Sequence, residues 1–128
     1  MEEYKLWIKQ SEDDLLWTKS SLENGIWYGA CFSAQQVVEK VLKAFLILKN
    51  KPLKKVHDVI GLLNECISLD NQFKDLEFEV KTVYPYYIET RYPSYEEISI
   101  FSEHEAKEAY NDARKVLSFV KNKLSNQT

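Results

Sequence analysis

The stretch Trp27–Leu48, WYGACFSAQQVVEKVLKAFLIL, constrains the fold more than any other part of the chain. Its apolar residues recur at spacings of three and four, which places them on one stripe of an α-helix. The stripe comprises Trp27, Ala30, Cys31, Ala34, Val37, Val38, Val41, Phe45 and Leu48. No proline interrupts the run, and Gly29 lies near its N-terminal end, where its entropic cost matters less. We therefore predict one long, buried helix against which the other helices pack.

The same stretch carries a row of polar residues on its other side. Gln35, Glu39 and Lys43 are spaced by four residues, with Gln36 and Lys40 alongside. Glu39 precedes Lys43 in the orientation that favours a helical ion pair. The plainer interpretation is an ion pair at the helix surface, which contributes little in water. The functional interpretation is a polar face available for binding.

Length and composition indicate one helical domain. We assign residues 1–124 of the 128-residue chain to it and expect the polar tail, residues 125–128, to fray. The chain has three glycines and three prolines, and so few of both favours helices with short connections. The net charge of −3 argues against bulk electrostatic capture of nucleic acid, but it is compatible with a local basic patch. Eight tyrosines and three tryptophans favour a surface that a partner covers.

The sequence gives no sign of a metal site, a signal peptide or a membrane span. Cys31 and Cys66 lie in apolar segments without a metal-ligand spacing, so we expect two buried free thiols, no metal site and no cofactor. The N-terminal segment is charged and lacks the apolar core of a signal peptide. No window approaches the roughly 18 apolar residues that span a membrane. The expected location is cytoplasmic.

Two further long helices are predicted on either side of the chain's middle. The first covers about residues 2–23, with Ser11 and Thr18 as small residues that allow a neighbouring helix to approach closely. Asn24-Gly25 ends it, and the short connection makes the next helix antiparallel. The last helix begins at Ser102-Glu-His-Glu105, which has the form of a capping box.

The middle of the chain is expected to hold one short and one longer helix. Asp58 is a predicted N-cap for the short helix. From Phe73 the apolar spacing predicts a fourth helix, which Pro85 must kink or end because its ring removes an amide donor. The fold class is therefore all-α, an up-and-down bundle of about four long helices plus one short helix.

Two segments outside the helices are unusual in composition. The connector KNKPLKKVHD contains four lysines, which either attract a phosphate backbone or are simply solvated. Its His57 either makes a local hydrogen bond or does chemistry. The stretch YPYYIETRYPSY, residues 84–95, holds five tyrosines and one arginine. It either covers the end of the bundle or forms a binding surface, where Arg91 meets a phosphate or carboxylate and the rings stack on bases.

Taken in order, these features resemble the HEPN family of small helical domains. The resemblance rests on SEDDLLWTKSSLENGIWYGACF, AQQVVEKVLKAFL, the HDV before the short helix, ETRYP and EAKEAYNDARKVLSFV. It implies a helical bundle that is usually dimeric. Many members are encoded beside a minimal nucleotidyltransferase and act with it as toxin and antitoxin. Many others are metal-independent ribonucleases whose motif is Arg, four to six residues, then His, completed across the dimer.

The chain departs from the ribonuclease pattern. After Arg91 the next histidine is His104, with twelve residues between them, so the catalytic pair is not carried over. What matches is the RYP form, found in members for which nucleotide or RNA binding is suggested. The positions that match the family are Gln35, Glu39, Lys43, His57, Asp58, Arg91, Tyr92 and Pro93.

Three functional hypotheses follow. The first is a non-catalytic, homodimeric module that binds a nucleotide or RNA and works with a minimal nucleotidyltransferase. Its binding residues would be Arg91, Tyr92, Gln35, Glu39, Lys43 and His57. The second is a metal-independent ribonuclease toxin that uses Arg91 with His104, Tyr92 or Tyr95. A tyrosine is a poor general base at neutral pH because its ordinary pKa is about 10. The third is a protein that only dimerises or docks a partner.

Overall fold

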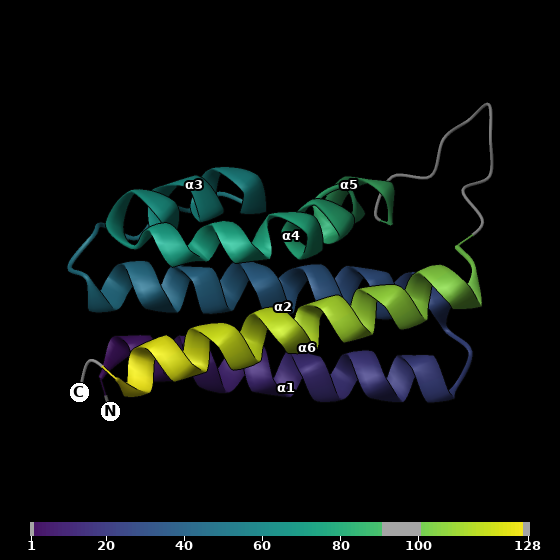
Figure 1. Ribbon diagram of the computed structural model, residues 1–128. Coiled ribbons are helices and arrows are strands. Elements are labelled where there is room, and N and C mark those ends of the chain that lie inside the picture. The colour runs from purple at the N-terminus through teal and green to yellow at the C-terminus, as the bar shows by residue number, and fades with distance from the viewer. Residues whose placement is uncertain (1, 91–100, 127–128) are drawn as a thin grey trace.

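The computed structural model describes residues 2–90 and 101–126, and all regular structure within these ranges is helical (Figure 1). The elements are α1 (Glu3–Glu23), α2 (Trp27–Leu48), α3 (Val59–Leu69), the 3-10 helix η1 (Asn71–Leu76), α4 (Glu77–Val83), α5 (Tyr86–Glu89) and α6 (Glu103–Ser125). The expected all-α bundle is confirmed. The predicted bounds of the central helix, Trp27–Leu48, are those of α2.

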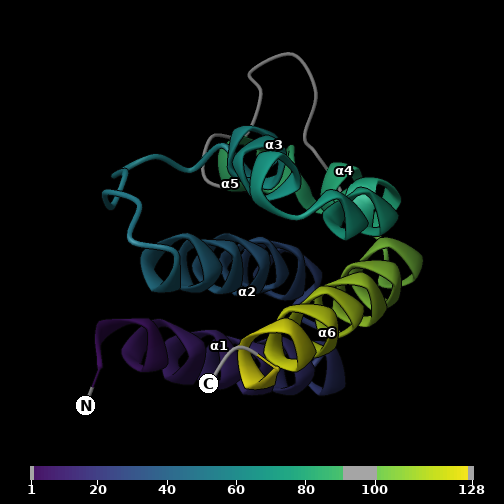
Figure 2. The same ribbon diagram turned by 60° about the vertical axis from the view of Figure 1, so that its left-hand side comes forward.

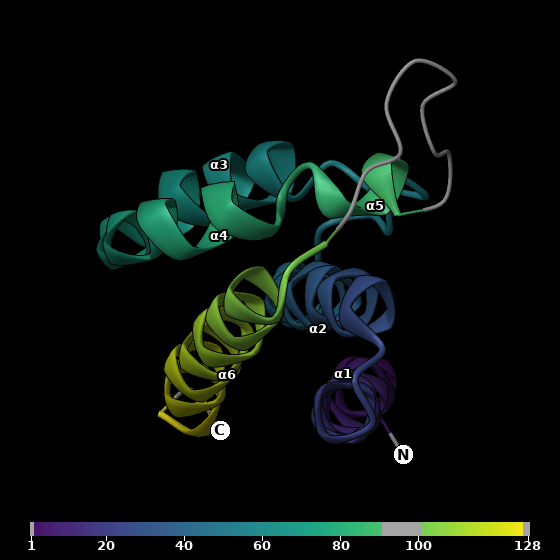
Figure 3. The same ribbon diagram turned by 90° about the vertical axis from the view of Figure 1, so that its right-hand side faces the viewer.

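Helix α2 lies at the centre of the molecule. Viewed end-on, α1 and α6 lie on one side of it, and α3 and α4 lie on the other (Figure 3). Most of the predicted apolar stripe is completely buried, and its two ends, Trp27 and Leu48, are partly buried. The other helices therefore owe their arrangement to this one element, because each buries its own apolar face against α2 or its neighbours.

Small residues bring α1 and α2 close together, as predicted. The hydroxyl of Ser11 donates a hydrogen bond of 2.8 Å to the carbonyl of Val37. The hydroxyls of Thr18 and Ser33 lie 2.7 Å apart and share a second hydrogen bond. Gly25 ends the hairpin's first helix with a φ of 73°, a left-handed conformation that glycine adopts without strain.

The helix predicted from Phe73 is broken into shorter elements. The Asp70 side chain accepts a hydrogen bond from the Gln72 amide at the start of η1, and the α-helical part begins at Glu77. Pro85 then separates α4 from α5, as a residue without an amide donor must. The predicted inward residue Phe73 is completely buried. The apolar spacing therefore gave the correct inner face, although the backbone is not one continuous helix.

Both predicted helix caps are present. Asp58 Oδ1 accepts a hydrogen bond of 3.0 Å from the amide of Gly61 at the start of α3. Ser102 and Glu105 form a reciprocal capping box at the start of α6.

The predicted burial of both cysteines is confirmed. Cys31 and Cys66 are buried, and burial raises the pKa of the Cys66 thiol. Across residues 2–90 and 101–126, none of the helices combines the length and apolar character needed to cross a membrane.

Enlarging Ser11 tests the close contact between α1 and α2. We expect Ser11→Leu to lower the free energy of unfolding by about 2 kcal/mol, because the site is completely buried and has no room for the added methyl groups. The exposed Ser20 on the same helix gives the matched control, and Ser20→Leu should stay within about 0.5 kcal/mol. Urea unfolding followed by circular dichroism measures both. Equal effects of the two substitutions would contradict the close packing.

Candidate functional site

A carboxylate lies inside the bundle on the polar side of α2. Glu39 is 3% exposed. Its Oε2 accepts a hydrogen bond of 3.1 Å from Lys43 Nζ. Its Oε1 accepts one of 3.3 Å from Gln35 Nε2 and lies 3.0 Å from His57 Nδ1. The side chains of Lys43, Gln35 and His57 thus all contact one buried carboxylate.

The Glu39–Lys43 pair forms as predicted, but its expected position at the helix surface is wrong. Lys43 is only 5% exposed, and its Nζ lies 5.6 Å from the centre of the Trp7 ring. Pro52 and Leu53 of the connector line a narrow gap beside it. The connector and α1 therefore cover a row of residues that the sequence pattern places on a polar face.

His57 is held at three points. Its Nδ1 faces the Glu39 carboxylate, its carbonyl accepts a hydrogen bond of 3.2 Å from Gln35, and its ring stacks on Tyr87 with centroids 3.9 Å apart. A carboxylate only accepts hydrogen bonds, so the Nδ1 of His57 carries a proton and donates it to Glu39 Oε1. The side chain is 48% exposed. The imidazole is thus fixed in position and still reachable from solvent.

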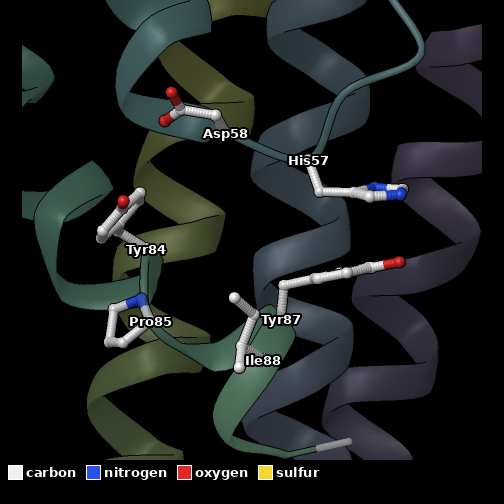
Figure 4. A pocket seen from close by; sticks show the side chains of 6 residues that line it. All are labelled: His57, Asp58, Tyr84, Pro85, Tyr87 and Ile88. Carbon is white, nitrogen blue, oxygen red and sulfur yellow. The ribbon is translucent and has the colours of Figure 1, made fainter.

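A hollow of about 460 Å³ lies beside this histidine (Figure 4). Its lining residues come from two segments far apart in the sequence: His57, Asp58, Tyr84, Pro85, Tyr87 and Ile88. Tyr84 and Ile88 are 47% and 65% exposed, so their side chains offer apolar surface at the hollow. The volume is within the range of small-ligand pockets.

The two stacked rings have their polar ends on the same side, away from the other side chains that line the hollow. In Figure 4 the rings of His57 and Tyr87 extend in the same direction, so the imidazole nitrogens and the tyrosine hydroxyl lie at one side. Tyr84 and Pro85 lie at the opposite side. A ligand with a flat apolar part and a polar part would match this separation.

The predicted site residues divide into three groups. Gln35, Glu39, Lys43 and His57 come together in one hydrogen-bonded cluster. Arg91, Tyr92, Pro93 and Tyr95 lie outside the described residues. His104 is exposed in the first turn of α6.

The sequence patterns did not assign the hollow itself. The tyrosine-rich stretch on either side of Pro85 was the sequence feature that pointed to it. No sequence pattern predicts that this stretch lies beside His57. Within residues 2–90 and 101–126, no group of three His, Cys, Asp or Glu side chains is placed to hold a metal ion.

Comparison with known proteins decides the family. The sequence pattern of the HEPN domain family matches residues 4–123 of this chain. The chain belongs to the HEPN family. This HEPN protein is 28% identical to MJ1304 of Methanocaldococcus jannaschii, which is described as a candidate toxin, and the match covers 94% of this chain and 87% of that protein.

Two solved structures resemble this HEPN protein closely. TT1696 from Thermus thermophilus has a TM-score of 0.83 and 31% identity, over 96% of this chain and 99% of that chain. ST0689, an archaeal HEPN homologue, has a TM-score of 0.78 and 30% identity, over 96% of this chain and 98% of that chain. The order and packing of the helices are therefore those of the family.

Removing the Glu39 charge tests whether the buried cluster is one unit. We expect Glu39→Gln to lower the free energy of unfolding by about 3 kcal/mol, because Lys43 keeps a buried charge without its counterion. Replacing both residues, as Glu39→Leu with Lys43→Met, should recover most of that loss. Urea unfolding of the single and double variants measures the coupling.

An exposed ion pair provides the control for this experiment. Lys121 Nζ lies 2.7 Å from Glu12 Oε2 at the surface, so Glu12→Gln should change stability by less than about 0.5 kcal/mol. If the double variant at Glu39 and Lys43 is as unstable as the single one, the ion pair is not what the cluster depends on.

Proposed function

We propose that this HEPN protein is a non-catalytic module that binds a nucleotide or RNA in the hollow beside His57. It acts as a homodimer and works with a minimal nucleotidyltransferase in a toxin–antitoxin type of system. The observation that carries the binding proposal is the hollow itself, where aromatic rings meet a histidine fixed by a buried carboxylate.

The shape and chemistry of the hollow suit a nucleobase. A base has a flat apolar face, and aromatic side chains stack on such faces without selecting a sequence. Tyr84 is exposed at the rim, and Pro85 and Ile88 add apolar surface. The base therefore goes to the side of Tyr84, and the sugar and phosphate go towards the polar ends of His57 and Tyr87.

The matched family positions have different roles in this proposal. Gln35, Glu39 and Lys43 are buried and bonded to one another, so they hold His57 in place rather than touch the ligand. His57 presents Nε2 to the ligand. Arg91 and Tyr92 follow Tyr87 in the sequence by four and five residues. We assign the phosphate to Arg91, because a guanidinium binds phosphate oxygens in pairs.

The proposed partners have separate support. Trp17, Ile26, Tyr28 and Phe32 line a second hollow of about 320 Å³ on the surface of α1 and α2. Apolar surface of this kind marks contact with another protein, which supports a dimer or a docked partner. The family resemblance supports the nucleotidyltransferase, and the description of MJ1304 as a candidate toxin supports the toxin–antitoxin context.

Titration with a fluorescent AMP analogue tests the base site. We expect saturable binding by the wild type and a loss of affinity of roughly tenfold in Tyr84→Ala, because a stacking ring is removed. Phe78→Ala is the matched control, since Phe78 is an exposed aromatic residue on α4 and does not line the hollow. Arg91→Ala should also weaken binding. No binding by the wild type, or equal affinities of Tyr84→Ala and Phe78→Ala, would reject the site.

One observation favours a second candidate, the metal-independent ribonuclease. A histidine whose Nδ1 is held by a buried carboxylate is positioned to transfer protons through Nε2. His57 then joins His104 and Tyr95 as a partner for Arg91. Incubating RNA with metal-free protein separates the candidates. We expect no cleavage from the binding module, whereas cleavage that disappears in both Arg91→Ala and His57→Gln would establish the enzyme instead.

A further inference from the structure

We propose that the α2–α3 connector, residues 49–58, is a track for the backbone of a single-stranded nucleic acid whose base occupies the hollow beside His57. This inference rests on the proposed nucleotide site and narrows its ligand. The ligand is a strand of several nucleotides, not a free mononucleotide.

The connector is a basic segment in an acidic protein. It contains four lysines and no acidic residue before Asp58, while the whole chain has a net charge of −3. Lys54 Nζ pairs with Glu65 at 3.1 Å. Lys51 and Lys55 are exposed, and no carboxylate in the described part of the chain pairs with either. Their charges are thus available to phosphates, while the acidic remainder of the surface disfavours other paths.

The structure fixes the start of the connector. Asn50 has a φ of 61°, and its amide donates to the carbonyl of Ile47 at 2.9 Å. The amide of Lys51 donates to the carbonyl of Leu46, also at 2.9 Å. These two bonds make a Schellman motif, which sets the direction in which the chain leaves α2. The backbone of Lys51 therefore has a defined position.

The end of the connector is also fixed, and its middle borders the bundle. Pro52 and Leu53 lie against the side chains of α2 and α3 that line a narrow gap. At the end, the His57 carbonyl is bonded to Gln35 and the Asp58 side chain caps α3. The lysine side chains therefore extend from a connector whose start and end are held by hydrogen bonds. Binding a strand to them costs less ordering than it would in a free loop.

The track is continuous with the hollow. Lys55 precedes His57 by two residues, so their backbones are at most about 7 Å apart, and Lys51 is at most about 20 Å away. Figure 2 shows the connector running outside the bundle between the end of α2 and the start of α3. The two lysines lie two and six residues before His57, so a strand that leaves the hollow along the connector passes both of them. Stacking in the hollow also needs an unpaired base, which excludes duplex interiors.

Fluorescence anisotropy with labelled strands of increasing length tests this inference. The probes are an AMP analogue and RNA and DNA oligonucleotides of the same sequence, each titrated at several salt concentrations. We expect longer strands to bind more tightly than AMP. In Lys51→Gln/Lys55→Gln the strand affinity should fall about fivefold at low salt, and the slope of log affinity against log salt should shrink by about 1.4. The AMP affinity should not change.

The matched control changes the net charge equally elsewhere. Lys19 on α1 and Lys74 in η1 are exposed, so Lys19→Gln/Lys74→Gln should leave the strand affinity near that of the wild type. Equal affinity of strands and AMP, or equal losses in the two double variants, would overturn the track while leaving the nucleotide site intact. Absence of AMP binding would instead reject the nucleotide site. Equal binding of RNA and DNA supports recognition of phosphates and stacked bases, and preference for RNA adds recognition of the 2′-hydroxyl.

Discussion

The structure around Glu39 must neutralise its buried carboxylate and hydrogen-bond to it. An ionised group inside a helical bundle costs several kcal/mol unless other groups neutralise it and bond to it. Lys43 supplies the opposite charge from the same helix, and Gln35 and His57 complete the set of donors. Because His57 directly precedes the cap of α3, satisfying this one charge also fixes where the connector ends. The ring of His57 then supports Tyr87, and with it one wall of the hollow.

Local sequence signals predicted the fold well. The apolar stripe of α2 gave its bounds, since a helix in the centre of a bundle must be apolar along its whole length. Asp58 and Ser102 marked two helix starts because their side chains satisfy free amides. Each of these signals lies within a few residues of the feature that it predicts.

The remaining features depend on contacts between distant segments. Spacing by four put Gln35, Glu39 and Lys43 on one side of α2, but it could not show that the connector covers that side. The segment from Phe73 has helical spacing, yet it begins as the 3-10 helix η1, which the Asp70 side chain caps. The hollow joins residues 57–58 to residues 84–88, which only the packing of the helices brings together.

These contacts change what the family motif means in this chain. The residues of AQQVVEKVLKAFL that match the family and carry polar groups are the buried ones, and they hold His57 rather than face the solvent. A protein can therefore have this motif for a structural reason, whatever it binds. Differences in ligand would arise from the exposed residues around the cluster: Tyr84 and Ile88 at the hollow, and Lys51 and Lys55 on the connector. Such residues can change without disturbing the buried charge, since none of them bonds to it. The same support for His57 could thus carry binding sites of different specificity.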